Sequence, residues 1–267
     1  AIPPIPGLER VPYFTNETIF ENQIHLSHLI VIGGGPIGLE LAQAHMRLGS
    51  RVTVLEAMKA LGKDDPELAE VALAKLRSDG LVIREGAKVE QIEPRPGGGV
   101  RVGFVTGAGT EVVEGTHLLV ATGRKPNVAD LNLEVAGIKF DRRGILVSKS
   151  LVTSNAKVFA IGDVVGGLQF THTANYHAGI VFRHLLLGRA AALLGKGGQV
   201  QTDHIPWVTY IDPEIANIGL TEEEARKRHG AINVYRWPFH ENDRAHAERA
   251  TEGFVKVLTD KKDRIVG

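Results

Sequence analysis

The chain has 267 residues, which is enough for more than one domain with its own core. Its 31 basic and 31 acidic residues cancel, so no overall field favours nucleic acid or a membrane surface, and we expect a small-molecule partner. The chain lacks cysteine, which excludes disulfides and thiol chemistry within it, and no apolar stretch is long enough to span a bilayer.

The first regular elements are predicted in the order strand, helix, strand. The opening AIPPIPGLERVPYF is typical of an extended connector, because prolines recur in it. HLIVIGGGPIGLELAQAHMRLGSRVTVLEA then holds an apolar strand at 29–32, a glycine turn, a helix stopped by Gly49 and a second strand at 51–55. The face expected to be buried on this helix consists of Ile37, Leu41, Ala44 and Leu48.

A glycine-rich turn joins the first strand to the helix. Gly33, Gly35 and Gly38 fill the pattern G-x-G-x-x-G. The first glycine permits the tight turn, the second lets backbone approach a pyrophosphate, and the third lets helix and strand pack closely. The phosphates then lie on the helix N-terminus, where N–H groups and the dipole favour anions. Against the alternative of a phosphate-free turn, we expect a dinucleotide site at Gly33, Gly34, Gly35, Pro36, Ile37 and Gly38.

Glu56, at the end of the second strand, indicates which dinucleotide binds. A carboxylate there accepts hydrogen bonds from the adenosine ribose hydroxyls and repels a 2′-phosphate, which favours NAD. A solvated acid at a strand end is the alternative reading. Lys59 and Lys63 are close enough in sequence to soften the repulsion.

The following elements complete an α/β domain with a β-meander. Residues 63–80 predict a helix with Asp65 as N-cap, Pro66 at the first helical position and Gly80 as the stop. LVIRE follows as a strand, and short strand-like runs over 87–116 are separated by PRPGGG and GAGTE, as in an antiparallel meander. HLLVATGRKPN then returns to a buried strand that ends in a Gly-Arg turn.

The stretch VFAIGDV, at 158–164, is a short apolar strand broken by Gly162 and Asp163. Turn statistics alone favour a solvated aspartate at a β-turn here. His172 and His177 are five residues apart, which is not the spacing that points two ligands from one helix face, so we expect no metal site.

Four motifs together carry a resemblance to a known family. They are GGGPIGLE followed by VTVLEA, then ATGRKPN, TSNAKVFAIGDV and YIDPEIANIGLTEEEA. With them the chain resembles, over nearly its whole length, the pyridine nucleotide–disulfide oxidoreductases, the flavoenzymes that include lipoamide dehydrogenase, mercuric reductase and glutathione reductase. The resemblance implies an α/β fold. Its parts are a Rossmann-like NAD-binding domain with a β-meander, the second part of an FAD-binding domain and a truncated α+β dimerisation domain.

The resemblance also implies roles for single residues. Asp163 would hydrogen-bond the ribityl chain of FAD, and the backbone of Thr171 would also meet the flavin. Glu40 matches a glutamate near flavin and nicotinamide, with an exposed helix-start acid as the alternative. Val89 matches an apolar contact to adenine, with ordinary strand core as the alternative. Gly123 would let backbone approach the nicotinamide side.

The family's organisation implies four segments. They are a connector from a missing FAD-binding half (1–23), the NAD-binding domain (24–125), the second FAD-domain segment (126–202) and the truncated interface domain (203–267). The whole protein is expected to be a cytoplasmic homodimer that transfers hydride between NADH and FAD and passes electrons to a disulfide or similar acceptor. The alternative, favoured for this chain alone, is a non-catalytic nucleotide-binding module, with no catalytic residue in the chain.

Overall fold

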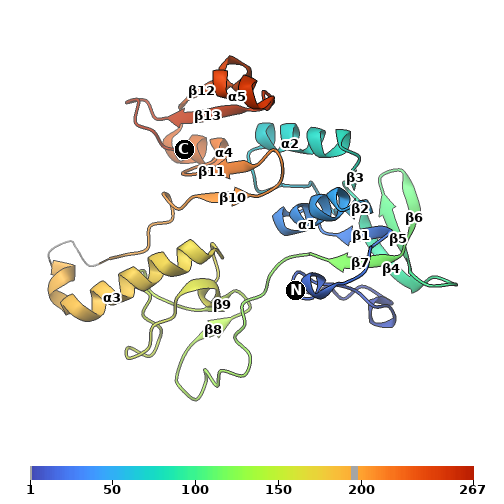
Figure 1. Ribbon diagram of the computed structural model, residues 1–267. Helices are drawn as coiled ribbons and strands as arrows, with labels where there is room; N and C mark the ends of the chain where they lie inside the picture. Colours follow the sequence, from blue (N-terminus) through green and yellow to red (C-terminus); the bar gives the residue numbers. More distant parts are fainter. Residues whose placement is uncertain (1, 194–197) are drawn as a thin grey trace. The chain divides into compact units, whose positions relative to one another are not determined.

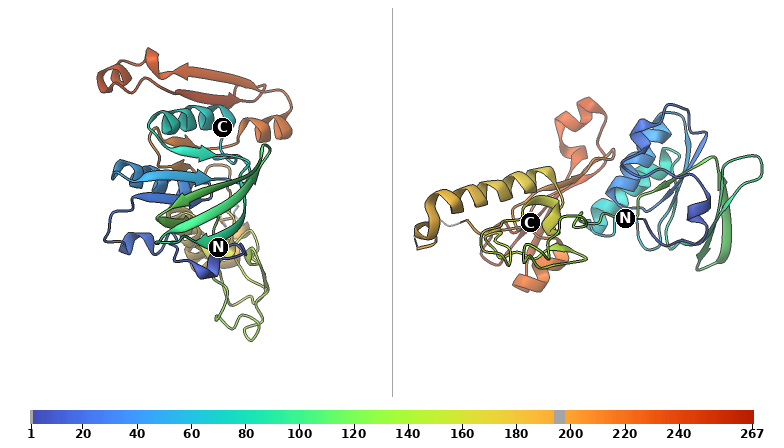
Figure 2. Two further views of the ribbon diagram at one scale, coloured as in Figure 1. Left: turned by 90° about the vertical axis from the view of Figure 1, so that its right-hand side faces the viewer. Right: turned by 90° about the horizontal axis from the view of Figure 1, so that it is seen from below.

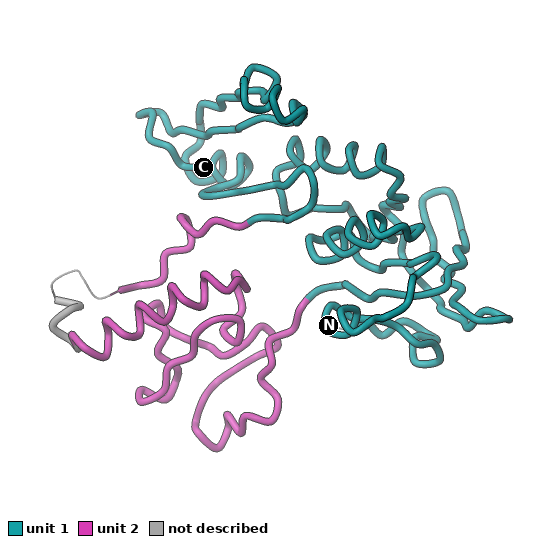
Figure 3. The backbone as a smooth tube through the Cα atoms, in the orientation of Figure 1, with its two compact units in different colours: residues 1–123, 208–267 teal, residues 124–207 magenta. Residues whose placement is uncertain are grey.

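The computed structural model describes residues 2–193 and 198–267. The chain divides into two compact units, residues 1–123 with 208–267, and residues 124–207 (Figure 3). No helix among the described residues is long and apolar enough to cross a membrane.

A four-stranded parallel sheet forms the centre of the first unit (Figure 1). Its strand order is β3-β2-β1-β7, and α1 and α2 are the crossovers that follow β1 and β2. The elements are β1 (His28–Ile32), α1 (Pro36–Arg47), β2 (Arg51–Leu55), α2 (Pro66–Ser78), β3 (Val82–Arg84) and β7 (His117–Val120). The predicted βαβ unit is therefore confirmed, and it continues through a second crossover.

The sheet is covered on both faces, because alternate residues of a strand point to opposite sides. Leu29 and Val31 pack in one core cluster with buried residues of α1 and α2. Ile30 and Ile32 pack in another with the antiparallel meander, which lies on the other face (Figures 1 and 2). The meander consists of β4 (Lys88–Pro94), β5 (Val100–Thr106) and β6 (Gly109–Gly115).

The buried face predicted for α1 was partly wrong. Leu41 is buried as expected, but Ala44 is exposed and Leu48 is 74% exposed. Gly38 faces the backbone of the turn that follows β1, which orients the helix. Leu39, Leu41 and Ala42 then pack in the core cluster on this side of the sheet, while residues 44 and 48 are exposed.

The prediction for α2 was correct. The Asp65 side chain accepts a hydrogen bond from the Glu67 amide, Pro66 occupies the first turn, and the helix ends at Ser78 just before Gly80. Gly80 has a φ of +108°, a backbone conformation that glycine adopts without strain.

The N-terminal residues contact this unit more closely than an extended connector requires. Phe14 exchanges backbone hydrogen bonds with Leu118 and Val120 of β7, and Leu8 and Val11 are buried in the meander-side core. Two short 3₁₀ helices, Leu8–Arg10 and Ile19–Glu21, interrupt the segment.

The C-terminal residues of the first unit form two small sheets and two helices (Figure 1). These elements are β10 (Trp207–Thr209), β11 (Ile215–Asn217), α4 (Glu222–His229), β12 (Asn233–Pro238), α5 (Asp243–Glu248) and β13 (Phe254–Thr259). Helix α1 holds the start of this region. The Gln43 amide pairs with both backbone groups of Asp212, and Arg47 contacts the Asp212 carboxylate.

A buried lysine holds β13 against two helix N-termini. The Lys256 side chain is 5% exposed, and its Nζ donates to Asp65 at 2.8 Å, Glu67 at 2.9 Å and Glu222 at 2.7 Å. Arg236 of β12 adds a two-pronged contact to Glu67. Carboxylates at the N-termini of α2 and α4 therefore share one ammonium group.

The second unit has a small core of its own. Leu133, Ile138, Ile145 and Ala160 are buried together. Its regular elements are β8 (Phe140–Asp141), β9 (Gly144–Ile145), the 3₁₀ helix η3 (Gly162–Val165) and α3 (Thr171–Leu193).

Candidate functional site

The glycine turn lies between β1 and α1, where the sequence predicts it. Gly33 has a φ of +114°, and a methyl group there would lie 2.5 Å from the carbonyl oxygen of Ala121. A methyl group at Gly38 would overlap the carbonyl oxygen of Gly33. These two glycines are therefore required by the packing of strand, turn and helix, independently of any ligand.

Gly35 differs from both of its neighbours in the motif. It is the N-cap of α1 with an ordinary φ of −78°, and apart from Gly35 itself and its two chain neighbours no heavy atom of the described residues lies within 4 Å of its Cβ position. No described side chain caps the helix either. The N–H groups of the first turn, with Pro36 exposed and Ile37 packed against the core, therefore suit an anion that approaches Gly35.

Glu56, directly after β2, closes one side of the turn. Its Oε2 accepts a hydrogen bond of 2.7 Å from the Gly34 amide, and its Oε1 accepts one of 2.8 Å from the Met58 amide. Each carboxylate oxygen has a second acceptor site, so ribose hydroxyls can still be bound. The carboxylate is therefore both part of the turn and a ligand group beside it.

The other candidates for NAD contacts lie on neighbouring segments of this unit. The Ala87 amide donates to the Glu56 carbonyl, so the backbone at Ala87 lies beside the residue that closes the glycine turn. Val89, two residues further on, packs against the meander core. Gly123 follows β7 with a φ of +129° and open space at its Cβ position.

Glu40 lies on the first turns of α1 and is half-buried. Its Oε1 accepts a 2.8 Å hydrogen bond from the Tyr210 amide, so this carboxylate is tied to the segment that enters the C-terminal region. No local sequence pattern indicates this contact, because it joins residues 170 positions apart.

The candidates for FAD contacts lie in the second unit. Asp163 follows buried Gly162 in η3, and its carboxylate is 56% exposed and lies 3.8 Å from the Arg124 guanidinium. Thr171 is exposed at the first residue of α3. Both are accessible to a ligand, and Gly162 has a φ of +71° that lets the chain turn sharply. The strand predicted before this turn is reduced to one isolated bridge between Phe159 and Val152.

One residue that contacts this turn was not among the predicted site residues. His177 of α3 is buried, and its Nδ1 accepts a 3.1 Å hydrogen bond from the Gly162 amide. Burial lowers the pKa of His177 below its usual value. Fifteen residues separate the partners, so no local pattern could have indicated the contact.

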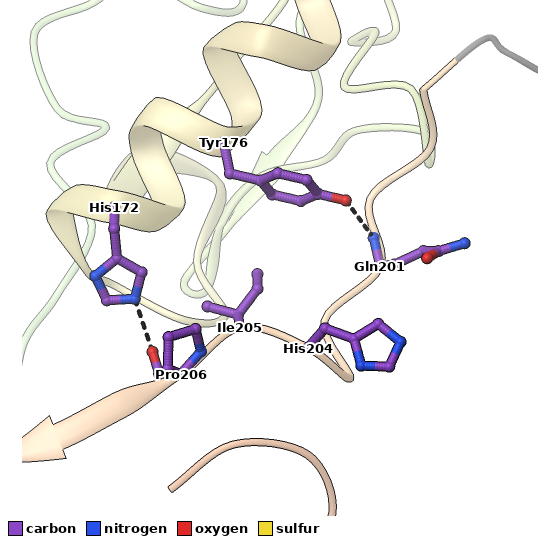
Figure 4. A pocket seen from close by; sticks show the side chains of 6 residues that line it. All are labelled: His172, Tyr176, Gln201, His204, Ile205 and Pro206. Atoms are coloured by element: carbon purple, nitrogen blue, oxygen red, sulfur yellow. Dashed lines mark hydrogen bonds between the residues drawn. The ribbon is translucent and has the colours of Figure 1, made fainter. Parts of the chain in front are cut away.

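A hollow of about 330 Å³ also lies in the second unit (Figure 4). The His172 ring nitrogen Nε2 donates to the carbonyl of Pro206 at 2.7 Å, and the Tyr176 hydroxyl accepts from the Gln201 amide at 3.1 Å. The lining residues are His172, Tyr176, Gln201, His204, Ile205 and Pro206. None of them is a predicted site residue. Within the described residues there is also no cluster of metal-ligating side chains.

Comparisons with known proteins match nearly the whole chain. Residues 1–178 match the family described as pyridine nucleotide-disulphide oxidoreductase, and residues 205–267 match the dimerisation domain of that family. The mercuric reductase of Lysinibacillus sphaericus is 36% identical over 97% of this chain and 46% of that protein. Dihydrolipoyl dehydrogenase 3 of Pseudomonas putida is 36% identical over 99% of this chain and 56% of that protein.

A solved structure agrees with these matches. The HOCl-induced flavoprotein disulfide reductase RclA from Escherichia coli superposes with a TM-score of 0.85 at 33% identity, over all of this chain and 60% of that one. The chain spans about half the length of the curated relatives it matches. The glycine turn, the sheet with its meander and both sequence matches agree: this chain belongs to the pyridine nucleotide-disulphide oxidoreductase family.

Proposed function

We propose that the chain is the NAD(H)-binding portion of an FAD-dependent pyridine nucleotide-disulphide oxidoreductase. The observation that carries the proposal is the turn of residues 33–38. There an uncapped helix N-terminus and the open space at Gly35 lie beside the Glu56 carboxylate. This arrangement fits a pyrophosphate at the helix and a ribose at the carboxylate.

Different residues would contact different parts of the bound cofactors. Backbone amides at the start of α1 would hold the pyrophosphate, Glu56 would accept from the ribose, and Gly123 would admit the nicotinamide end because its Cβ position is open. Asp163 and the Thr171 backbone would contact FAD in the whole protein. Bound NADH would supply a hydride for transfer to FAD in the whole protein. For the whole protein we propose a disulfide or similar electron acceptor.

We propose an NAD-binding domain at 24–125, a second FAD-domain segment at 126–202 and an interface domain at 203–267, through which the whole protein forms a homodimer. The match of residues 205–267 to the family's dimerisation domain supports the last of these. We also propose a cytoplasmic location.

NADH is expected to bind more tightly than NADPH, because a 2′-phosphate would face the Glu56 carboxylate and like charges at a site cost several kcal/mol. Glu56→Gln should reduce this preference roughly tenfold, since it removes the charge. Titration by nicotinamide fluorescence measures both affinities.

The matched control is Glu85→Gln. Glu85 follows the next strand, β3, and its carboxylate accepts from the Ala60 amide and from Arg77. This variant should keep the preference for NADH. Equal binding of NADPH by the unaltered chain, or an unchanged preference in Glu56→Gln, would contradict the role of Glu56.

A second candidate function, a nucleotide-binding module without turnover, is favoured for this chain by itself. The chain contains no cysteine, so it carries no dithiol to pass electrons on, and its FAD candidates are two residues without a second pyrophosphate turn. We expect a mixture of the chain with NADH, added FAD and a disulfide to oxidise NADH no faster than the mixture without protein. Saturable oxidation that Gly35→Val abolishes would contradict this expectation.

A further inference from the structure

The residue that fixes the Gly162–Asp163 turn is a histidine on another element. Gly162 has a left-handed φ of +71° and lies directly before Asp163. Its amide donates to Nδ1 of His177, which lies two turns into α3. The bond is buried, so its loss would leave the Gly162 amide without a hydrogen-bond partner and away from water, at a cost in free energy.

The geometry assigns a protonation state to the ring. A ring nitrogen that accepts a hydrogen bond from a backbone amide carries no proton itself, so Nδ1 is unprotonated and the ring proton of neutral His177 lies on Nε2. A doubly protonated ring would place an N–H opposite the N–H of Gly162. The contact therefore exists only while the imidazole is neutral.

We infer that His177 is a positioning residue for the Gly162–Asp163 turn, and that the turn is held or released according to the protonation of its ring. The contact itself is independent of the proposed function. Its consequence for flavin binding rests on the proposed role of Asp163.

The surroundings of the ring determine how far pH must fall before the contact is lost. Burial lowers the pKa of His177 below 6.5, so the contact is complete at neutral pH and is lost as pH falls through this lowered pKa. On α3, the Tyr176 ring lies 6.1 Å from the imidazole and Thr173 shares its buried face. On the turn, the exposed Asp163 carboxylate lies near Arg124.

Two variants distinguish the effect of the hydrogen-bond acceptor of His177 from the effect of the volume of its ring. His177→Asn places a neutral oxygen close to the Nδ1 position, so it should keep the contact and remove its pH dependence. His177→Phe keeps an aromatic ring and removes the acceptor. Thr173→Val is the matched control. Its hydroxyl is buried one turn away on the same face and has no hydrogen-bond partner among the described residues.

The test is nitrogen-15 NMR of the full chain between pH 5 and 8. We expect Nδ1 unprotonated at pH 8, and the Gly162 amide shift should move with the same midpoint as the His177 ring. Hydrogen exchange at Gly162 should accelerate on the order of tenfold in His177→Phe, but not in Thr173→Val. In His177→Asn the amide should stay protected at every pH.

A proton on Nδ1 at pH 8, or a Gly162 amide that does not titrate with His177, would overturn the inference. If His177→Phe fails to fold, the titration of the unaltered chain still decides. Because the Gly162 amide is measured with no NADH or FAD added, this result does not depend on whether either cofactor binds.

Discussion

Replacing Gly38 with alanine is expected to lower the free energy of unfolding by about 3 kcal/mol, the upper end of what forced overpacking costs. The methyl group would overlap the carbonyl oxygen of Gly33, and backbone cannot move aside as a flexible side chain can. Urea unfolding measures the loss. Stability within about 1 kcal/mol of the unaltered chain would show that helix and strand do not pack as described.

Gly35→Ala is expected to have the opposite profile. Its φ suits alanine and its Cβ position is open, so the free energy of unfolding should fall by about 1 kcal/mol or less, because alanine is a weaker N-cap than glycine. NADH affinity should nevertheless fall at least roughly tenfold, because the methyl group occupies the approach of the pyrophosphate. Gly107→Ala, in open space between β5 and β6, is the control that should change neither property. Unchanged NADH affinity in Gly35→Ala would contradict the proposed site.

Lys256→Met is expected to lower the free energy of unfolding by about 3–5 kcal/mol, the usual cost of removing one partner from a buried ion pair. The change leaves the carboxylates of Asp65, Glu67 and Glu222 without their shared ammonium group. Lys75→Met is the control, because its partner Asp79 forms a more exposed pair on the surface of α2, and it should cost less than about 1 kcal/mol. Equal losses in both variants would contradict the buried role of Lys256.

The same cluster predicts sensitivity to acid. Hydrogen bonds from Arg236 and then Lys256 lower the pKa of Glu67 from 4.5 to about 2. Their contribution is complete above pH 4.5 and is lost as pH falls from 4.5 towards 2, because the unfolded chain binds the proton first. In Lys256→Met the dependence of stability on pH in this range should be weaker. Urea unfolding at a series of pH values measures it.

The features that could be predicted from the sequence are those encoded by patterns of neighbouring residues. The βαβ unit, the cap of α2 and the meander follow from apolar periods, capping residues and turn glycines that lie within a few positions of one another. The buried face of α1 could not be read this way. Its period was correct, but its rotation is set by the contact between Gly38 and the turn.

The contacts that hold the C-terminal region to α1 and α2, and that hold His177 to the Gly162 turn, join distant residues. Lys256 and Asp65 are 191 positions apart, Gln43 and Asp212 are 169 apart, and Gly162 and His177 are 15 apart. A single sequence carries no periodic signal for such pairs. The residues of the glycine turn were predictable because backbone geometry and ligand approach are encoded in one short segment, 33–38.

Titration of the nitrogen-15-labelled chain with NADH shows whether the glycine turn binds the dinucleotide, because amide shifts report where a ligand binds. We expect saturable shifts of the amides of residues 33–38, apart from Pro36, and of Met58, whose amide donates to Glu56. The amides of residues 239–248, around α5, should be unaffected. Shifts confined to residues outside the glycine turn, or no saturation with NADH, would contradict the claim that this turn binds the dinucleotide.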